Sequence, residues 1–140
     1  MKPLKTPKNT AKELSKAKKK LWPLVAKLAK DGDNWTCFTC GAKGEGKFIH
    51  AGHFISRNHQ STYYDLRNIH AQCINCNFWK GGELGIYAQK LIKLLGIKGF
   101  DNLVETGQKQ KRWELNQINK LIESAKKGYY AYTQTYKKLI

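Results

Sequence analysis

Two cysteine pairs of the same form constrain the fold of this chain more than any other feature of its sequence. The pairs, Cys37-Phe-Thr-Cys40 and Cys73-Ile-Asn-Cys76, contain all four cysteines and are separated by thirty-two residues. Two such pairs are typical of a tetrahedral thiolate site for structural zinc, which would clamp both segments together. A centre this small is expected to fold only when the metal binds. In a secreted chain the same cysteines would instead form two disulfides.

The positive charge of the chain is its second informative feature, a net +16 over 140 residues. Residues 1–34 hold ten lysines against three acidic residues, and residues 109–140 hold eight basic residues against two acidic ones. The stretch between them, 35–108, has a net charge of only +3. This distribution is typical of basic arms that grip a polyanion such as DNA and release its counterions. The alternative is a basic surface with no dedicated partner, which costs self-repulsion.

The N-terminal region gives no sign of a leader or of a membrane anchor. Its apolar stretch Leu21–Ala29 is short and interrupted by a lysine, and no cleavage signal follows it. With cysteines arranged for metal binding, this predicts an intracellular, cytoplasmic protein with no membrane partner.

Four regions are expected along the chain. They are a basic tail, a basic N-terminal helix region, a zinc-bound core and a helical C-terminal region, over residues 1–9, 10–34, 35–82 and 83–140. Apolar residues at spacings of three and four predict a helix from Asn9 or Thr10 to about Lys30. Pro23 is expected to kink or restart this helix, and the sequence Asp-Gly-Asp-Asn at 31–34 to end it.

Within the core, alternating apolar and polar residues predict two strands, Phe48–Ile55 and Asn68–Cys73. The connection 56–67 is polar and is expected to contact a ligand. A short helix is expected over Cys76–Lys80, ended by Gly81-Gly82. The combination predicts an α+β fold.

The C-terminal region is expected to be helical and amphipathic. One helix is predicted over Glu83–Leu95, with Gly96 as its stop and a further helical turn over 100–105. A second stripe at spacings of three and four predicts a long helix that Gly128 weakens. The stripe would pack on the N-terminal helix, which we favour, or pair two copies in a homodimer. Its members, with tyrosines expected as packing groups, are Leu115, Ile118, Ile122, Ala125, Tyr129, Tyr132, Tyr136 and Leu139.

Three residues between and beside the cysteine pairs have the chemistry of a phosphodiester hydrolase: His53, Asn68 and Asn77. Such an enzyme needs a base for water and a divalent cation to offset charge on the phosphorane. A histidine that is neutral near pH 7 suits the first task, and an asparagine carbonyl oxygen is a suitable ligand for Mg²⁺. The other asparagine would fix the tautomer and orientation of the histidine through a hydrogen bond.

The spacing of these residues resembles the HNH, or ββα-metal, endonucleases in the variant that carries asparagine at the last position. His53 follows the first cysteine pair, Asn68 precedes the second pair by five residues, and Asn77 follows it directly. More closely, the chain resembles the lambdoid-phage NinG (Rap) recombination nucleases over about residues 12–127. That resemblance is carried by Ala51–Arg57, Asp65–Cys73, Cys76-Asn77, Lys80–Gly82, Tyr87 and the sequence Lys-Arg-Trp-Glu at 111–114.

The resemblance implies a zinc-stapled ββα-metal (HNH-like) core with flanking basic helices, and a metal-dependent DNA endonuclease that cleaves branched recombination intermediates. It makes His53 the general base, Asn68 its orienting partner and Asn77 a ligand of a catalytic Mg²⁺ or Mn²⁺. The chain departs from the wider HNH pattern at Gly52, where an aspartate often binds the metal. His70 is our first choice for the missing ligand, and the alternatives are His50, Asp65 or water. Apart from that possibility His50, like His59, is interpreted as an ordinary polar residue.

Simpler roles remain open for these residues. Asn68 could cap a turn, and Asn77 could be the N-cap of the helix that it begins. Arg57, Arg67 and Lys80 would contact phosphates or belong to a solvated rim. For the whole chain, the alternatives to a nuclease are a non-catalytic zinc-ribbon protein that binds nucleic acid and, with support only from charge and aromatic residues, an RNA-binding protein.

Overall fold

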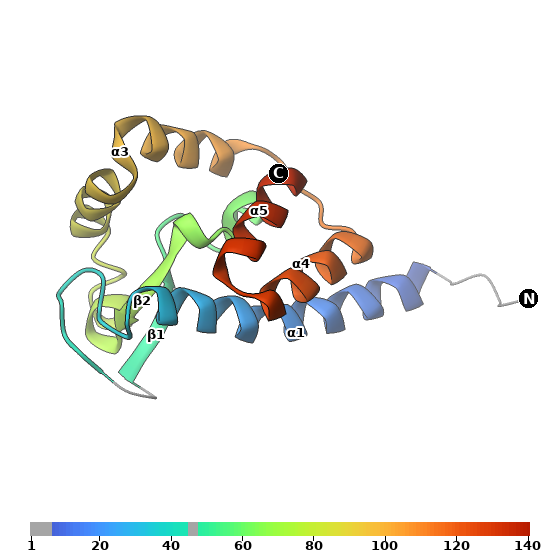
Figure 1. Ribbon diagram of the computed structural model, residues 1–140, viewed down its shortest axis with the longest axis horizontal. Helices are drawn as coiled ribbons and strands as arrows, with labels where there is room; N and C mark the ends of the chain where they lie inside the picture. Colours follow the sequence, from blue (N-terminus) through green and yellow to red (C-terminus); the bar gives the residue numbers. More distant parts are fainter. Residues whose placement is uncertain (1–6, 45–47) are drawn as a thin grey trace, which may run out of the picture.

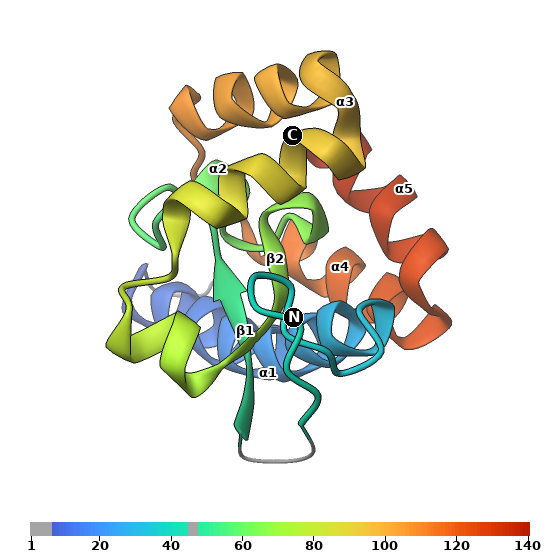
Figure 2. The same cartoon turned by 90° about the vertical axis from the view of Figure 1, so that its left-hand side faces the viewer.

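The computed structural model describes residues 7–44 and 48–140. In these residues a two-stranded antiparallel sheet lies among helices, as Figures 1 and 2 show, which confirms the α+β class. Of the predicted basic tail, residues 1–6 lie outside the described residues, whereas residues 7–9 already belong to the first helix. Among the described residues, no helix combines the length and the apolar character needed to span a bilayer.

Helix α1 (Pro7–Gly32) runs along one side of the molecule, horizontally through the lower part of Figure 1, with one end at the sheet. It begins earlier than predicted and continues through Pro23, so the predicted restart there is wrong. A proline removes one backbone hydrogen bond, but Pro23 is exposed while Leu21 and Val25 on either side are fully buried. Their packing holds the helix together across the missing bond. The predicted stop is confirmed, because the helix ends at Gly32.

The sheet consists of β1 (Ile49–His53) and β2 (Ile69–Cys73), with His50 opposite Gln72 and Gly52 opposite His70. Both strands are shorter than predicted, because the chain turns away after His53 and enters β2 through a 3₁₀ turn. Helix α1 contacts both strands. On the face that carries His70, the cysteine loop places Phe38 on the His70 ring, with ring centroids 4.0 Å apart. The face of the sheet is therefore covered by the loop that carries the first cysteine pair.

The second half of the connection between the strands packs inward, whereas residues 56–59 are exposed, so contact of this connection with a ligand stays a prediction. The connection contains α2 (Gln60–Tyr63) and the 3₁₀ turn η2 (Leu66–Asn68). Ser61, Thr62 and Asp65 are buried, and the side chains of Thr62 and Asp65 find partners inside the chain, namely the His59 carbonyl and Arg67. After β2, the π-helical turn η3 (Asn75–Trp79) stands where a short helix was predicted, and glycines with positive φ follow it as expected.

Helix α3 (Leu84–Gln108) consists of two helical segments that meet at Gly96, whose φ is 76°. The predicted stop is thus confirmed, but the segment after it is much longer than the turn expected over residues 100–105. Tyr87 and Leu91 of the predicted apolar face are buried, whereas Leu84 is 49% exposed. The predicted face is therefore only partly correct, since Ile92 is 38% exposed as well.

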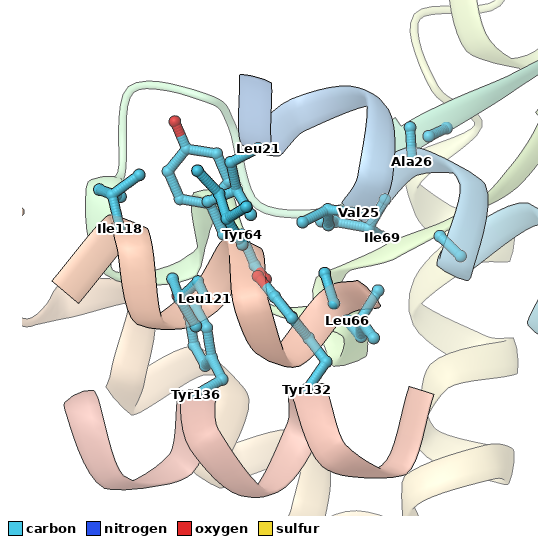
Figure 3. Close-up of a cluster of buried hydrophobic side chains, with 14 of the residues drawn as sticks. Leu21, Val25, Ala26, Tyr64, Leu66, Ile69, Ile118, Leu121, Tyr132 and Tyr136 are labelled. Atoms are coloured by element: carbon cyan, nitrogen blue, oxygen red, sulfur yellow. The ribbon is translucent and has the colours of Figure 1, made fainter. Parts of the chain in front are cut away.

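The C-terminal stripe packs within the chain, as favoured from the sequence, but it forms two helices, α4 (Leu115–Lys127) and α5 (Tyr129–Leu139). Gly128 separates them with a φ of 122°, which side chains rarely allow. Figure 3 shows Ile118, Leu121 and Tyr132 meeting Leu21 and Val25 of α1. The stripe tyrosines Tyr132 and Tyr136 are buried packing groups, as expected, whereas Tyr129 is 45% exposed and does not follow the prediction. Pairing of two copies stays a prediction.

Candidate metal and catalytic centre

The four cysteines form one cluster, with their sulfur atoms all within 4.8 Å of one another. The Sγ atoms of Cys40 and Cys73 are 3.7 Å apart, and tetrahedral zinc with Zn–S bonds of about 2.3 Å separates its sulfurs by about 3.8 Å. All four thiols are free of disulfides. The cluster therefore fits a structural zinc ion that joins the loop after α1 to the end of β2.

Thr39 connects this cluster to the sheet. Its hydroxyl lies 3.4 Å from Cys37 Sγ and accepts a hydrogen bond of 3.2 Å from Gln72 Nε2. Burial opposes ionisation of Cys37, but the Thr39 hydroxyl and neighbouring backbone amides outweigh it and lower the pKa of this thiol to about 6. Burial raises the pKa of Cys76. Adjacent thiolates repel, so the complete set ionises only around a cation.

His53, the predicted base, ends β1 and contacts the connection between the strands. Its Nε2 lies 2.8 Å from the carbonyl oxygen of Tyr63. A carbonyl only accepts, so Nε2 carries the proton and Nδ1 carries the lone pair. Burial lowers the pKa of His53 to about 4, the Tyr63 carbonyl opposes this shift, and the positive charge of Arg57 adds to it. The imidazole is therefore neutral near pH 7, and its buried Nδ1 has no hydrogen-bond partner.

Asn68 does not hydrogen-bond the imidazole, so the predicted direct contact is wrong. Its Oδ1 accepts from the amide of Ile55 at 2.6 Å, and its Nδ2 donates to the carbonyls of Ile55 and Thr62. These backbone groups come just after His53 and just before Tyr63. The fully buried Asn68 side chain thus ties together the two segments that set the position of the imidazole.

Asn77 lies inside the turn η3, whose N-cap is Ile74, so capping does not explain it. Its Nδ2 is 3.3 Å from His50 Nδ1, and its Oδ1 faces Gly52. Because successive strand residues point to opposite faces, Asn77 and the imidazole of His53 approach the end of β1 from opposite sides. Figure 2 shows η3 leaving the sheet beside β1.

The other candidate metal ligands have partners of their own, although the Nε2 of His70 is buried without a hydrogen-bond partner. The Nδ1 of His70 lies 3.0 Å from the carboxylate of Asp33, and the carboxylate of Asp65 accepts from the Arg67 guanidinium at 2.7 Å. Among the histidines of the described residues, His50 is the one in contact with Asn77, and metal binding by His70 stays a prediction.

The three predicted phosphate-binding residues differ in how free they are. Arg67 is occupied, because it also donates to Asn102 and Thr106 of α3. Arg57 and Lys80 are exposed, and the Arg57 guanidinium lies 5.7 Å from the ring centre of Trp22. Phosphate contact stays a prediction for all three, with Arg67 the least available.

Sequence reasoning missed two residues of this centre. Trp22 of α1 stacks on the imidazole of His53, with ring centroids 5.1 Å apart. Gln72 is fully buried, and its amide points at Gly52. The alternation of β2 could have revealed Gln72, since it shares a face with His70. Nothing in the sequence pointed to Trp22, whose position depends on how α1 docks on the sheet.

Comparisons with known proteins agree with one another. A protein-family model described as "Bacteriophage Lambda NinG protein" matches residues 2–135. Protein ninG of Salmonella phage P22 is 36% identical over 78 residues, which are 55% of this chain and 37% of that protein. Proteins ninG of Escherichia phage 933W and Escherichia phage lambda are 32% and 30% identical over 82 residues, 58% of this chain.

These 82 residues make up 40% and 39% of the phage 933W and phage lambda proteins. The aligned part of this chain therefore spans about two fifths of the length of these curated relatives. No solved structure matches the chain.

Proposed function

We propose that this chain, which belongs to the bacteriophage NinG protein family, is a nuclease. The proposed reaction is metal-dependent hydrolysis of DNA phosphodiester bonds at an HNH-type centre, with branched recombination intermediates in the host cytoplasm as substrates. The observation that carries it is the imidazole of His53, which is neutral and fixed in one tautomer. His53 directly follows Gly52, which faces the side-chain oxygen of Asn77.

His53 is proposed to accept the proton of the attacking water. The Tyr63 carbonyl holds the proton on Nε2, so the Nδ1 lone pair is the basic atom. A pKa of about 4 makes the free imidazole a weak base. A bound phosphate would raise this pKa, because a nearby anion favours the charged form. The base would thus become effective only when DNA is present.

A catalytic cation would bind beside Gly52, on the face of the sheet opposite to the imidazole of His53. The side-chain oxygen of Asn77 is held there, with its amide nitrogen turned toward His50. An amide oxygen is a suitable ligand for Mg²⁺ or Mn²⁺. Such a cation would offset negative charge on the phosphorane and the leaving oxygen. Zinc in the cysteine cluster would have a closed shell of four sulfurs and would serve the fold alone.

DNA as the substrate is supported by the placement of basic residues. Helix α1 packs one face on the sheet and exposes lysines on the rest of its surface: Lys12, Lys16, Lys19, Lys20 and Lys27. The α4 and α5 helices expose Lys120, Lys126, Lys127, Lys137 and Lys138. Helices of this kind can contact several phosphates without reading base edges, which suits recognition of DNA by shape.

The direct test is cleavage of labelled DNA by the zinc-loaded protein with Mg²⁺ or Mn²⁺. Four-way junctions and forks are expected to be nicked in preference to linear duplex of the same sequence, and His53→Ala is expected to lose about 10²–10⁴-fold in rate. Asn58→Ala, in the exposed part of the connection, is the matched control. Equal rates of DNA cleavage by His53→Ala and by wild type would contradict the proposal.

A non-catalytic protein that binds nucleic acid is the second candidate, favoured by the absence of a carboxylate at Gly52. It predicts that the chain binds branched DNA in chelator and that restoring divalent metal produces no cleavage.

A further inference from the structure

The side chain of Gln72 is fixed in an orientation that leaves one buried oxygen without a partner. Its Nε2 donates to the carbonyl oxygen of Gly82 at 2.8 Å and to the Thr39 hydroxyl. The Gly82 carbonyl only accepts, so the amide cannot be turned around. Oε1 therefore points the other way, where it is buried and receives no hydrogen bond. Buried polar atoms are rarely left in this state.

The unpartnered oxygen lies against Gly52. A Cβ added to Gly52 would stand 2.9 Å from Asn77 Oδ1 and closer still to Gln72 Oε1. Gly52 has no positive φ, so backbone conformation does not require glycine here. What requires glycine is the space that the two amide oxygens occupy.

Asn77 is oriented in the same manner as Gln72. Its Nδ2 donates toward His50 Nδ1, which leaves Oδ1 on the side of Gly52. Both amides thus have their nitrogen atoms anchored on the protein and their oxygen atoms turned toward one point. Two carbonyl oxygens that converge without a donor between them repel unless a cation or a water lies close to both.

From this geometry we infer that Gln72 Oε1 and Asn77 Oδ1 together bind the divalent cation, with Gln72 supplying the ligand that Gly52 lacks. His50 is then a positioning residue for Asn77, and Thr39 is one for Gln72. This inference rests on the proposed nuclease function only for the role of the cation and can be tested without cleavage.

The charge of the site predicts how it binds. Both ligands are neutral, so the cation keeps its full charge and is expected to bind weakly until a DNA phosphate completes its shell. The arrangement also links the two metals, because the Thr39 hydroxyl that contacts Cys37 holds the Gln72 amide. Loss of the cysteine-bound ion is therefore expected to weaken the second site.

The test of the site is binding of Mn²⁺ to the zinc-loaded full chain. Electron paramagnetic resonance measures this binding with and without a short DNA duplex. Wild type is expected to bind one Mn²⁺, more tightly with DNA. Gly52→Ala and Gln72→Met are each expected to weaken this binding about 10–100-fold, as changes around metal ligands do. Asn77→Asp is expected to strengthen it about tenfold, because it adds a charged oxygen ligand.

Asn75→Ala, an exposed change in the same turn, is the control and is expected to bind Mn²⁺ as wild type does. Zinc content and far-UV circular dichroism show whether each variant is folded, and the gain from Asn77→Asp cannot come from misfolding. Wild type that binds no Mn²⁺ under either condition overturns the inference, as does unchanged binding by Gln72→Met. Mn²⁺ binding that depends on Gln72 without any cleavage supports the inference and removes the nuclease function instead.

Discussion

Two parts of this molecule are held together in different ways. The helical body, formed by α1, α4 and α5 with the connection between the strands, shares most of a core of sixteen buried apolar residues. The site lobe, formed by residues 35–44, β1, β2 and η3, relies on four thiols and on the amides of Gln72 and Asn77. We therefore expect the body to stay folded without a metal, whereas we expect the arrangement of the site to depend on one.

Removal of the cysteine-bound metal should separate the two parts most clearly. Chelation or Cys76→Ser is expected to abolish DNA cleavage and Mn²⁺ binding, because the cysteine loop no longer covers the sheet. Far-UV circular dichroism should retain most of the helical signal, and among the described residues limited proteolysis should cut 35–44 first. Asn75→Ser in the same turn should keep the metal. Complete unfolding on chelation would show that the body has no stability of its own.

A cavity in the helical body should lower the stability of the body and leave metal binding by the cysteines unchanged. Leu121→Ala removes a fully buried side chain and is expected to cost about 2–5 kcal/mol of unfolding free energy. Urea titration measures this cost, and Leu94→Ala on α3, where the side chain is 59% exposed, is the control. The zinc content of the folded protein should not change. A loss of zinc affinity equal to the loss of stability would mean that the two parts fold as one.

Asn68→Ala tests the junction between the two parts. The variant leaves buried backbone groups of Ile55 and Thr62 without partners and is expected to cost about 1–3 kcal/mol. Because these groups position the imidazole, the pKa of His53 measured by NMR should rise from about 4 toward its ordinary value of 6.5. A stability loss with no change in this pKa would leave Asn68 with a structural role only.

The smallest effect is the dependence of stability on the protonation of His53. The unfolded chain protonates this imidazole near pH 6.5 and the folded chain only near pH 4. The unfolded state thus binds more protons between these values, so stability falls as the pH falls from 6.5 to 4. At about pH 5.5 the penalty is about 1.4 kcal/mol by linkage. His53→Gln should lack this component in urea titrations at pH 7 and 5.5, and identical pH dependence would contradict the buried, neutral imidazole.

Local patterns predicted much of the fold. The spacing of apolar residues identified α1, the first segment of α3 and the C-terminal stripe, and the glycines at 96 and 128 marked the breaks between helices. Predictions failed where packing outweighed propensity, as at Pro23, which α1 passes because its neighbours are buried. The inward packing of the second half of the polar connection between the strands was not predicted either, and there the Thr62 hydroxyl and the Asp65 carboxylate find partners inside the chain.

At the site, the metal cluster was predictable from the amino-acid sequence, because the spacing within and between cysteine pairs is a local and chemically specific signal. The sequence also singled out His53, Asn68 and Asn77. The folded arrangement was needed to show which nitrogen of His53 is free, that Asn68 acts through the backbone, and that the side-chain oxygens of Gln72 and Asn77 both lie beside Gly52. The reason is physical: a hydrogen bond fixes a tautomer or an amide orientation, and its partners here lie on segments that only folding brings together.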